Sequence, residues 1–332
     1  MALEHGGRIK AAARAIGIPE DQWLDLSTGI SPWSWPPPPI PDSVWRRLPE
    51  DDDGLEDQAR HCLGVPDAAG LQALAGSQQA IMRLPELRPF SRVGVPMPGY
   101  REHAHCWQQA GHQVVDLSRE EVPQALPELD VLVWIHPNNP SGEIVPVETL
   151  LAWWEQLQVR GGWLIVDEAF VEASDAESLI SQTGREGLIV LRSVGKFFGL
   201  AGLRGGFMAG PPSLCQALAQ AIGPWAVSGP ARWLMRQALT DKTWQVMQKK
   251  RLQDESRALV SLLMEKGFHP VGGTALFQTV RHDDPRHVEA ALRQQGVLVR
   301  AFDEAPWLRF GLPGGEARML RAARALDSVL PS

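Results

Sequence analysis

The chain has 332 residues, 44% of them hydrophobic, which is enough for one large domain and one smaller domain. Its 32 basic and 39 acidic residues give a formal net charge of −7, so no basic excess is available for a nucleic-acid partner. Three widely spaced cysteines argue against a zinc site or a disulfide framework. With no apolar signal core in MALEHGGRIK and no apolar run of about 20 residues, we expect a cytoplasmic protein without a metal or a membrane partner.

The first 40 residues are predicted to be largely irregular. A helix is expected at residues 7–17 and an extended stretch at 27–32. Four consecutive prolines in WPPPPIP, at 35–41, favour a polyproline II conformation. We interpret this stretch as a rigid connector across the protein surface.

The middle of the chain alternates short apolar runs with amphipathic stretches. Strands are expected at 92–95, 130–135, 163–166 and 188–191, because these runs are short and rich in β-branched residues. Helices are expected at 101–110 and 147–159. The alternation predicts an α/β fold with a mostly parallel sheet and helices on both faces. Such sheets bind ligands beyond the carboxyl ends of their strands.

The last 90 residues or so are predicted to form a smaller α+β domain. Its expected helices lie at 242–266, 287–295 and 315–329. Its expected strands lie at 275–280, 297–301 and 308–311.

The segment LRSVGKFFGLAGLRGG, at 191–206, carries the most specific chemical signal. Lys196 follows an apolar strand in a glycine-rich turn, where its amine can form an imine with a carbonyl. Ser193 and Arg204 can surround a phosphate beside it. A nucleotide-binding P-loop is excluded, because its lysine must be followed by Ser or Thr and here Phe197 follows. The arrangement therefore indicates pyridoxal phosphate.

Other predicted strand ends carry the groups that this cofactor needs. Its pyridine nitrogen must pair with a buried carboxylate, for which Asp167 in DEAF is the candidate and Glu168 the less favoured neighbour. Its phenolate oxygen needs an amide donor, which Asn139 in HPNNPSG can supply. Tyr100 in MPGYREH can pack against the ring. A predicted helix start in LAGSQQAI offers backbone N–H groups to the phosphate at Gly76, Ser77 and Gln78.

The order GSQQ, PGY, HPNNPSG, DEAF, SVGK, GLRGG and WLRFG resembles the fold-type I aspartate-aminotransferase superfamily, in the branch that includes histidinol-phosphate aminotransferases. The resemblance implies a homodimer that shares its active site between subunits. It also implies that residues 1–40 join the small domain and cover the site, that 41–240 bind the cofactor and that 241–332 form the small domain. Arg309 in WLRFG matches the arginine that binds the substrate carboxylate.

The opening HGGRIKAAARAIGIPEDQWLDLSTGISPW resembles the threonine-phosphate decarboxylases of cobalamin synthesis. This resemblance implies decarboxylation of L-threonine O-3-phosphate to (R)-1-amino-2-propanol O-2-phosphate. The matching positions expected to bind this phosphorylated amino acid are His5, Gly6, Ser31, Asn139, Arg300 and Arg309.

Three departures from the pattern limit the resemblance. Phe170 stands where relatives commonly have a tyrosine, and Gly195 replaces a phosphate-binding serine. A tyrosine usually contributed by the neighbouring subunit is absent near Leu48. Two other functions stay open: an aminotransferase for histidinol phosphate or a related amino acid, and a non-catalytic regulator with the same fold.

Overall fold

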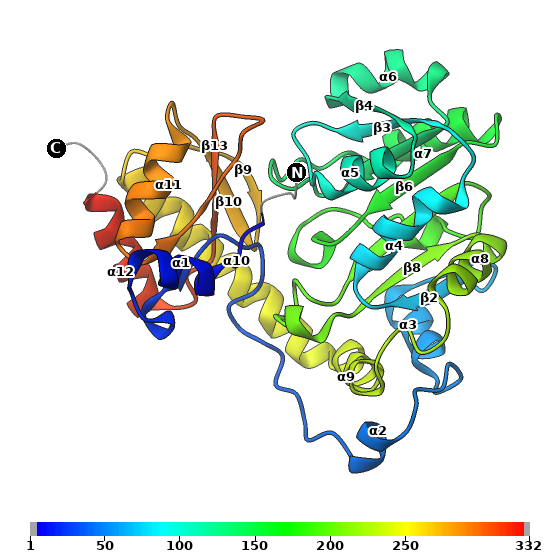
Figure 1. Cartoon of the computed structure of the whole chain (residues 1–332), viewed down its shortest axis with the longest axis horizontal. Helices are drawn as coiled ribbons and strands as arrows, with labels where there is room; N and C mark the ends of the chain where they lie inside the picture. Colours follow the sequence, from blue (N-terminus) through cyan, green and yellow to red (C-terminus); the bar gives the residue numbers. More distant parts are fainter. Residues whose placement is uncertain (1–4, 329–332) are drawn as a thin grey trace.

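The computed structural model describes residues 5–328 and places a seven-stranded sheet at the centre of the large domain (Figure 1). The strand order is β2-β8-β7-β6-β5-β3-β4. Only β8 runs against its neighbours β2 and β7 in this sheet, so the predicted mostly parallel α/β fold is confirmed. The strands are β2 Gly70–Leu74, β3 Arg92–Pro96, β4 Gln113–Leu117, β5 Val131–Ile135, β6 Trp163–Asp167, β7 Leu188–Ser193 and β8 Gly206–Gly210.

Helices cover both faces of this sheet because alternate strand residues face two separate cores. Leu132 and Val190 pack in one core with α7, whereas Val133 and Ile189 pack in the other with α4, α5 and α8. All residues of β5 are buried, as a two-sided central strand requires. The helices of this domain are α3 Leu55–Leu63, α4 Ser77–Arg83, α5 Glu102–Gln109, α6 Val122–Ala125, α7 Val147–Gln158, α8 Pro212–Ile222 and α9 Gly229–Thr240.

The small domain follows Asp241, whose side chain caps the long helix α10 by accepting a hydrogen bond from the Trp244 backbone. Its four-stranded antiparallel sheet has the order β12-β13-β10-β9. The elements are α10 Lys242–Glu265, β9 Pro270–Thr274, β10 Phe277–Arg281, α11 Pro285–Gln294, β12 Arg300–Ala301, β13 Trp307–Gly311 and α12 Glu316–Asp327.

The N-terminal segment packs on the small domain. Its first helix, α1 Ile9–Ile16, lies beside α11, and β1 Leu24–Asp25 pairs in parallel with β11 Val297–Leu298. The chain then passes through an extended stretch to α2 Asp42–Arg46, which lies at the edge of the large domain beside α9 (Figure 1). The N-terminal segment thus packs against the C-terminal part of the chain. The domain boundaries at residues 40 and 240 stay a prediction.

Several expected elements differ in detail from the structure. The strand expected at 275–280 begins at Phe277, because Ala275 and Leu276 form the turn after β9. The strand expected at 297–301 is divided, since β11 pairs with β1 and β12 pairs with β13. The last helix ends at Asp327, and the end expected at 329 lies outside the described residues. Among residues 5–328, no helix is long and apolar enough to span a membrane.

Candidate active site

Two adjoining cavities lie at the carboxyl ends of β5, β6 and β7, where a parallel sheet is expected to bind its ligand. We call the one of about 360 Å³ the inner cavity and the one of about 410 Å³ the outer cavity. They share the lining residues His5, Tyr100, Glu102, Asn139, Phe170 and Lys196. The inner cavity faces the sheet, and the outer cavity reaches β12 and β13 of the small domain.

Lys196 lies at the junction of both cavities, in the turn after β7. Burial lowers the pKa of its amine to about 8, and the nearby cations Arg309 and Arg204 act in the same direction against Asp167. The Lys196 carbonyl accepts a hydrogen bond from the Ser31 backbone at 3.0 Å, which holds the turn. A lysine with this pKa is a free amine, and therefore a nucleophile, at mildly alkaline pH.

Asp167 is the last residue of β6 and lines the inner cavity together with Lys196. Its Oδ2 lies 2.9 Å from Nε2 of the buried His103, and its Oδ1 accepts the Ala169 backbone N–H at 3.0 Å. These contacts hold the carboxylate in place beside the cavity. His103 was not anticipated from the sequence, although its position three residues after Tyr100 places it on the first turn of α5.

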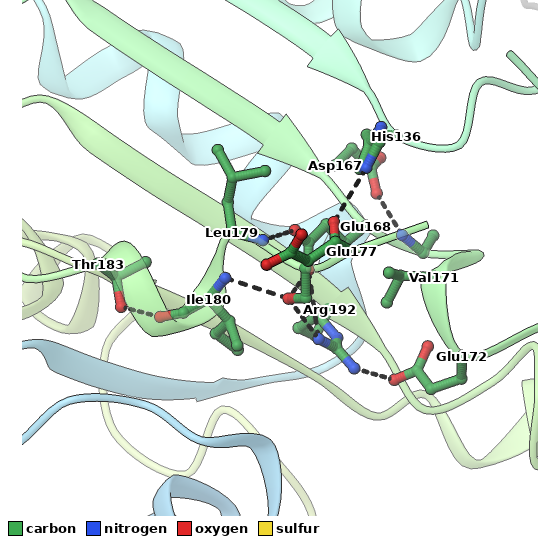
Figure 2. A network of polar contacts seen from close by, with 12 residues as sticks. His136, Asp167, Glu168, Val171, Glu172, Glu177, Leu179, Ile180, Thr183 and Arg192 are labelled. Atoms are coloured by element: carbon green, nitrogen blue, oxygen red, sulfur yellow. Dashed lines mark hydrogen bonds and ion pairs between the residues drawn. The ribbon is translucent and has the colours of Figure 1, made fainter. Parts of the chain in front are cut away.

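Glu168, the less favoured pyridine partner, does not line the inner cavity and instead contacts Leu179 and Arg192 (Figure 2). Its carboxylate accepts the Leu179 backbone N–H at 2.6 Å and the Ser178 hydroxyl at 2.5 Å, and it pairs with Arg192 at 3.2 Å. Successive residues at a strand end face opposite sides, so Asp167 and Glu168 cannot serve the same ligand. Burial raises the pKa of Glu168, partly offset by Arg192. The network of Glu168, Arg192 and Glu172 ties the ends of β6 and β7 together.

The expected phosphate-binding residues come together at the other end of the inner cavity: Gly76, Ser77, Gln78, Ser193 and Arg204 all line it. Close packing explains the glycine at 76, where φ is +80° and a Cβ would lie 2.8 Å from Nη2 of Arg204. At this point the backbone at the start of α4 approaches the guanidinium as closely as it can.

Tyr100 borders both cavities and is held by a hydrogen bond and a ring contact. Its hydroxyl donates to Oε1 of Gln78 at 3.1 Å, and its ring meets the His103 ring edge-on at 6.2 Å between centroids. Burial raises the pKa of Tyr100, so the phenol stays a hydrogen-bond donor. The structure thus places this ring beside the cavity that would hold the cofactor.

Arg309 is a buried cation that lines the outer cavity. It donates to Oδ1 of Asn139 and, at 2.7 Å, to the Ser27 carbonyl. Within residues 5–328, no carboxylate forms an ion pair with it and its Nε has no hydrogen-bond partner. Arg300 lies opposite on the neighbouring strand and lines the same cavity. Burial, and then Arg300, lower the pKa of Arg309 to about 10.

Two arginines in cross-strand register concentrate positive charge at one wall of the outer cavity, which Glu102, Asp303 and Glu304 also line. Asn139 lies between this pair and Lys196, because it lines both cavities and its amide oxygen is taken by Arg309. The amide nitrogen of Asn139 is then the end that can donate to a ligand. The outer cavity is therefore suited to a ligand with more than one anionic group.

The N-terminal residues divide into two groups. His5 lines both cavities and Gly6 lines the outer one. Ser31, expected to bind substrate, lines neither cavity. Its hydroxyl donates to the Trp33 carbonyl at 2.8 Å and accepts from Nε2 of Gln248 at 2.6 Å, so it supports the Lys196 turn from behind. Ser27 takes its place at the cavity wall.

Phe170 also lines both cavities, at the position where a tyrosine is common in the resembling proteins. Its ring centre lies 5.8 Å from Nζ of Lys196 and meets Phe277 edge-on at 5.3 Å. Gly29 packs against it, since a Cβ there would lie 2.8 Å from the ring. This wall is apolar, and Phe170 has no hydroxyl with which to contact the phenolate oxygen of the cofactor. Asn139 is then the side chain expected to make that contact.

Residues 63–326 match the family of class I and II aminotransferases, and the chain belongs to this family. A threonine-phosphate decarboxylase of Pseudomonas aeruginosa is 50% identical over 326 residues, covering 98% of this chain and 97% of the relative. A threonine-phosphate decarboxylase of Sinorhizobium sp. is 37% identical, with coverage of 98% and 97%.

The fold matches solved members of the same group. The histidinol-phosphate aminotransferase of Sinorhizobium meliloti, solved in complex with pyridoxal-5′-phosphate, superposes with a TM-score of 0.85. The match covers 99% of this chain and 95% of that chain at 19% identity, so it speaks for the fold alone.

The inner cavity fits pyridoxal 5′-phosphate. Of its lining residues, Lys196 would supply the amine for the cofactor's carbonyl carbon, Asp167 the carboxylate for its pyridine nitrogen and Asn139 the amide for its phenolate oxygen. Arg204 and Ser193 line the cavity beside the backbone N–H groups at the start of α4, where the positive φ of Gly76 (+80°) favours glycine, and these groups would bind the phosphate. Each group that the cofactor requires is thus present on one cavity wall.

The pKa of Lys196 predicts how fast the cofactor-free protein captures pyridoxal phosphate. The amine is charged below its pKa and reactive above it, so the capture rate should rise about tenfold per pH unit and level off near pH 8. Stopped-flow absorbance of the cofactor across the neutral and alkaline range measures this rate. A rate that still rises near pH 10, as for an ordinary lysine, would contradict the assigned environment.

Proposed function

We propose that this chain decarboxylates L-threonine O-3-phosphate to (R)-1-amino-2-propanol O-2-phosphate, a step in cobalamin synthesis, with pyridoxal phosphate as its cofactor. The observation that carries the proposal is the Arg300–Arg309 pair facing the cavity that contains Lys196. A phosphorylated amino acid offers this pair a phosphate and a carboxylate. Relatives with that activity in their names, 50% and 37% identical over nearly the whole chain, support it.

The residues divide the work between holding the cofactor and orienting the substrate. When bound, pyridoxal phosphate supplies an electron sink for the bond that breaks at the substrate's α-carbon. Asp167 would accept the pyridine N–H, and Lys196 would supply the amine that attaches the cofactor. After carbon dioxide leaves, the α-carbon needs one proton in its place, and the Lys196 amine is suited to deliver it.

Which bond breaks depends on the orientation of the substrate. Decarboxylation requires the bond to the carboxylate to stand perpendicular to the cofactor ring, whereas transamination requires the Cα–H bond there. Arg309 would hold the carboxylate, and Arg300 with His5 would hold the phosphate. Two separate anion sites restrict rotation of the substrate better than one, which is how these residues can select the reaction.

The product formed from L-threonine phosphate tests the proposal. We expect carbon dioxide and an amino-propanol phosphate in equal amounts, without keto acid. The matched control is Lys196→Ala, which should abolish turnover and the visible absorbance of attached cofactor while the protein stays folded. Amino transfer to 2-oxoglutarate at comparable efficiency would establish an aminotransferase instead. A protein that neither binds cofactor nor turns over would support the regulator.

We further propose that the protein is a cytoplasmic homodimer. Trp45 on α2 and Leu48 shortly after it are each 63% exposed. Large apolar side chains so exposed at the edge of the large domain are suited to contact a second subunit. Arg204, which lines the inner cavity, is also exposed and lies where a partner can cover the phosphate site.

Light scattering tests the assembly. The mass expected is twice 36.5 kDa, and Trp45→Ser combined with Leu48→Ser should shift the protein towards monomer because the apolar contact is lost. Leu320→Ser, at an exposed leucine on α12, is the matched control and should leave the mass unchanged. A wild-type monomer at micromolar concentration would contradict the proposal.

A further inference from the structure

The segment His5–Gly6–Gly7, which we call the cover segment, is attached at one end to the N-terminal loop. The Gly7 backbone N–H donates to Oγ of Ser27 at 2.8 Å, and this hydroxyl donates to Oδ1 of Asp25 at 2.5 Å. Gly6 lies directly on the Ser27 carbonyl, where a Cβ would be only 2.3 Å from the oxygen. This end therefore moves with β1 and the small domain.

The other end of the cover segment reaches the large domain. Nε2 of His5 lies 2.6 Å from Oε1 of Glu102, the first residue of α5. The His5 side chain is 48% exposed and the Glu102 side chain only 15%. The His5 ring also meets the Tyr100 ring, tilted, at 6.1 Å between centroids, so this ring contact and the contact with Glu102 together set its position.

The second carboxylate oxygen of Glu102 is held by a residue that lines the inner cavity. Oε2 accepts from Nε2 of Gln78 at 3.1 Å, and Oε1 of Gln78 accepts from the Tyr100 hydroxyl at 3.1 Å. The hydrogen bonds thus run from Tyr100 through Gln78 and Glu102 to His5. Residues that contact the cofactor orient the carboxylate, and the carboxylate orients the histidine.

This series of hydrogen bonds leaves one ring nitrogen of His5 available to bind a ligand. A carboxylate accepts hydrogen bonds, so Nε2 of His5 carries the hydrogen in this contact. Nδ1 has no hydrogen-bond partner within the described part of the chain. On a protonated ring Nδ1 is a charged donor, which suits a phosphate oxygen in the outer cavity, where Arg300 also lies.

We propose that Glu102 is a positioning residue that docks the cover segment onto the large domain and aims His5 at the phosphate of the substrate. The inference rests on the proposed function for the identity of that phosphate, but the docking itself does not depend on it. Glu102 does not contact the reacting atoms in this scheme. It links an occupied cofactor cavity to closure of the substrate cavity.

The docking can be measured without substrate. In Glu102→Gln the amide can accept from only one of the two donors, His5 or Gln78, so one contact is lost. Backbone amide exchange across residues 5–9 of the cofactor-bound protein should become faster by about 3- to 30-fold. Glu128→Gln, which removes an exposed ion pair with Arg92, is the matched control and should leave this exchange unchanged. Unchanged exchange in Glu102→Gln overturns the docking.

The kinetic role is read from a double-mutant cycle with L-threonine phosphate. His5→Ala and Glu102→Gln should each raise KM by about 10-fold with little change in kcat, and the double variant should match the single ones. Glu102→Asp, which keeps the charge, should recover part of the loss. Additive losses, or a lower affinity for pyridoxal phosphate with KM unchanged, would overturn the proposal, since Glu102 would then serve only the cofactor cavity. If L-threonine phosphate is not turned over, the proposed function fails while the exchange experiment still decides the docking.

Discussion

The site depends on burying cations whose charge is only partly compensated. Burial is the largest cause of the lowered pKa of both Lys196 and Arg309, although Asp167 opposes it at Lys196 and Asp25 at Arg309. For Arg309, hydrogen bonds to the Ser27 carbonyl and to the Asn139 amide oxygen offset part of the lost hydration. In return the protein holds a reactive amine and a set of anion sites that only ligands complete.

Two domains have to meet to build this cavity. The large domain supplies Lys196 and Asp167 at the ends of parallel strands, and the small domain supplies Arg300 and Arg309 from an antiparallel pair. The N-terminal segment, by pairing with β11 and reaching α5 through His5, joins both. Substrate recognition is therefore expected to depend on the relative position of the domains, whereas most residues that line the inner cavity belong to the large domain.

The sequence was sufficient for the fold class and for those site residues that directly follow apolar strands. Asp167 and Lys196 could be placed because a strand end fixes its position in an open sheet. Glu102 and His103 were missed because polar residues at the start of a helix are commonly just solvated, and only the fold brings Glu102 to the cavities and His103 to Asp167. Ser31 was misplaced because its motif does not show which way the loop turns. The split of the expected strand 297–301 likewise depends on partners distant in sequence.

The central claim is that the outer cavity recognises a doubly anionic amino acid. The most direct measurement is the ratio of kcat/KM for L-threonine phosphate to kcat/KM for L-threonine in the wild-type protein. Charge-assisted hydrogen bonds from Arg300 and His5 to the phosphate predict a ratio of about 10 to 100 or higher. A ratio near one would show that the phosphate gains nothing from this cavity and would contradict the account.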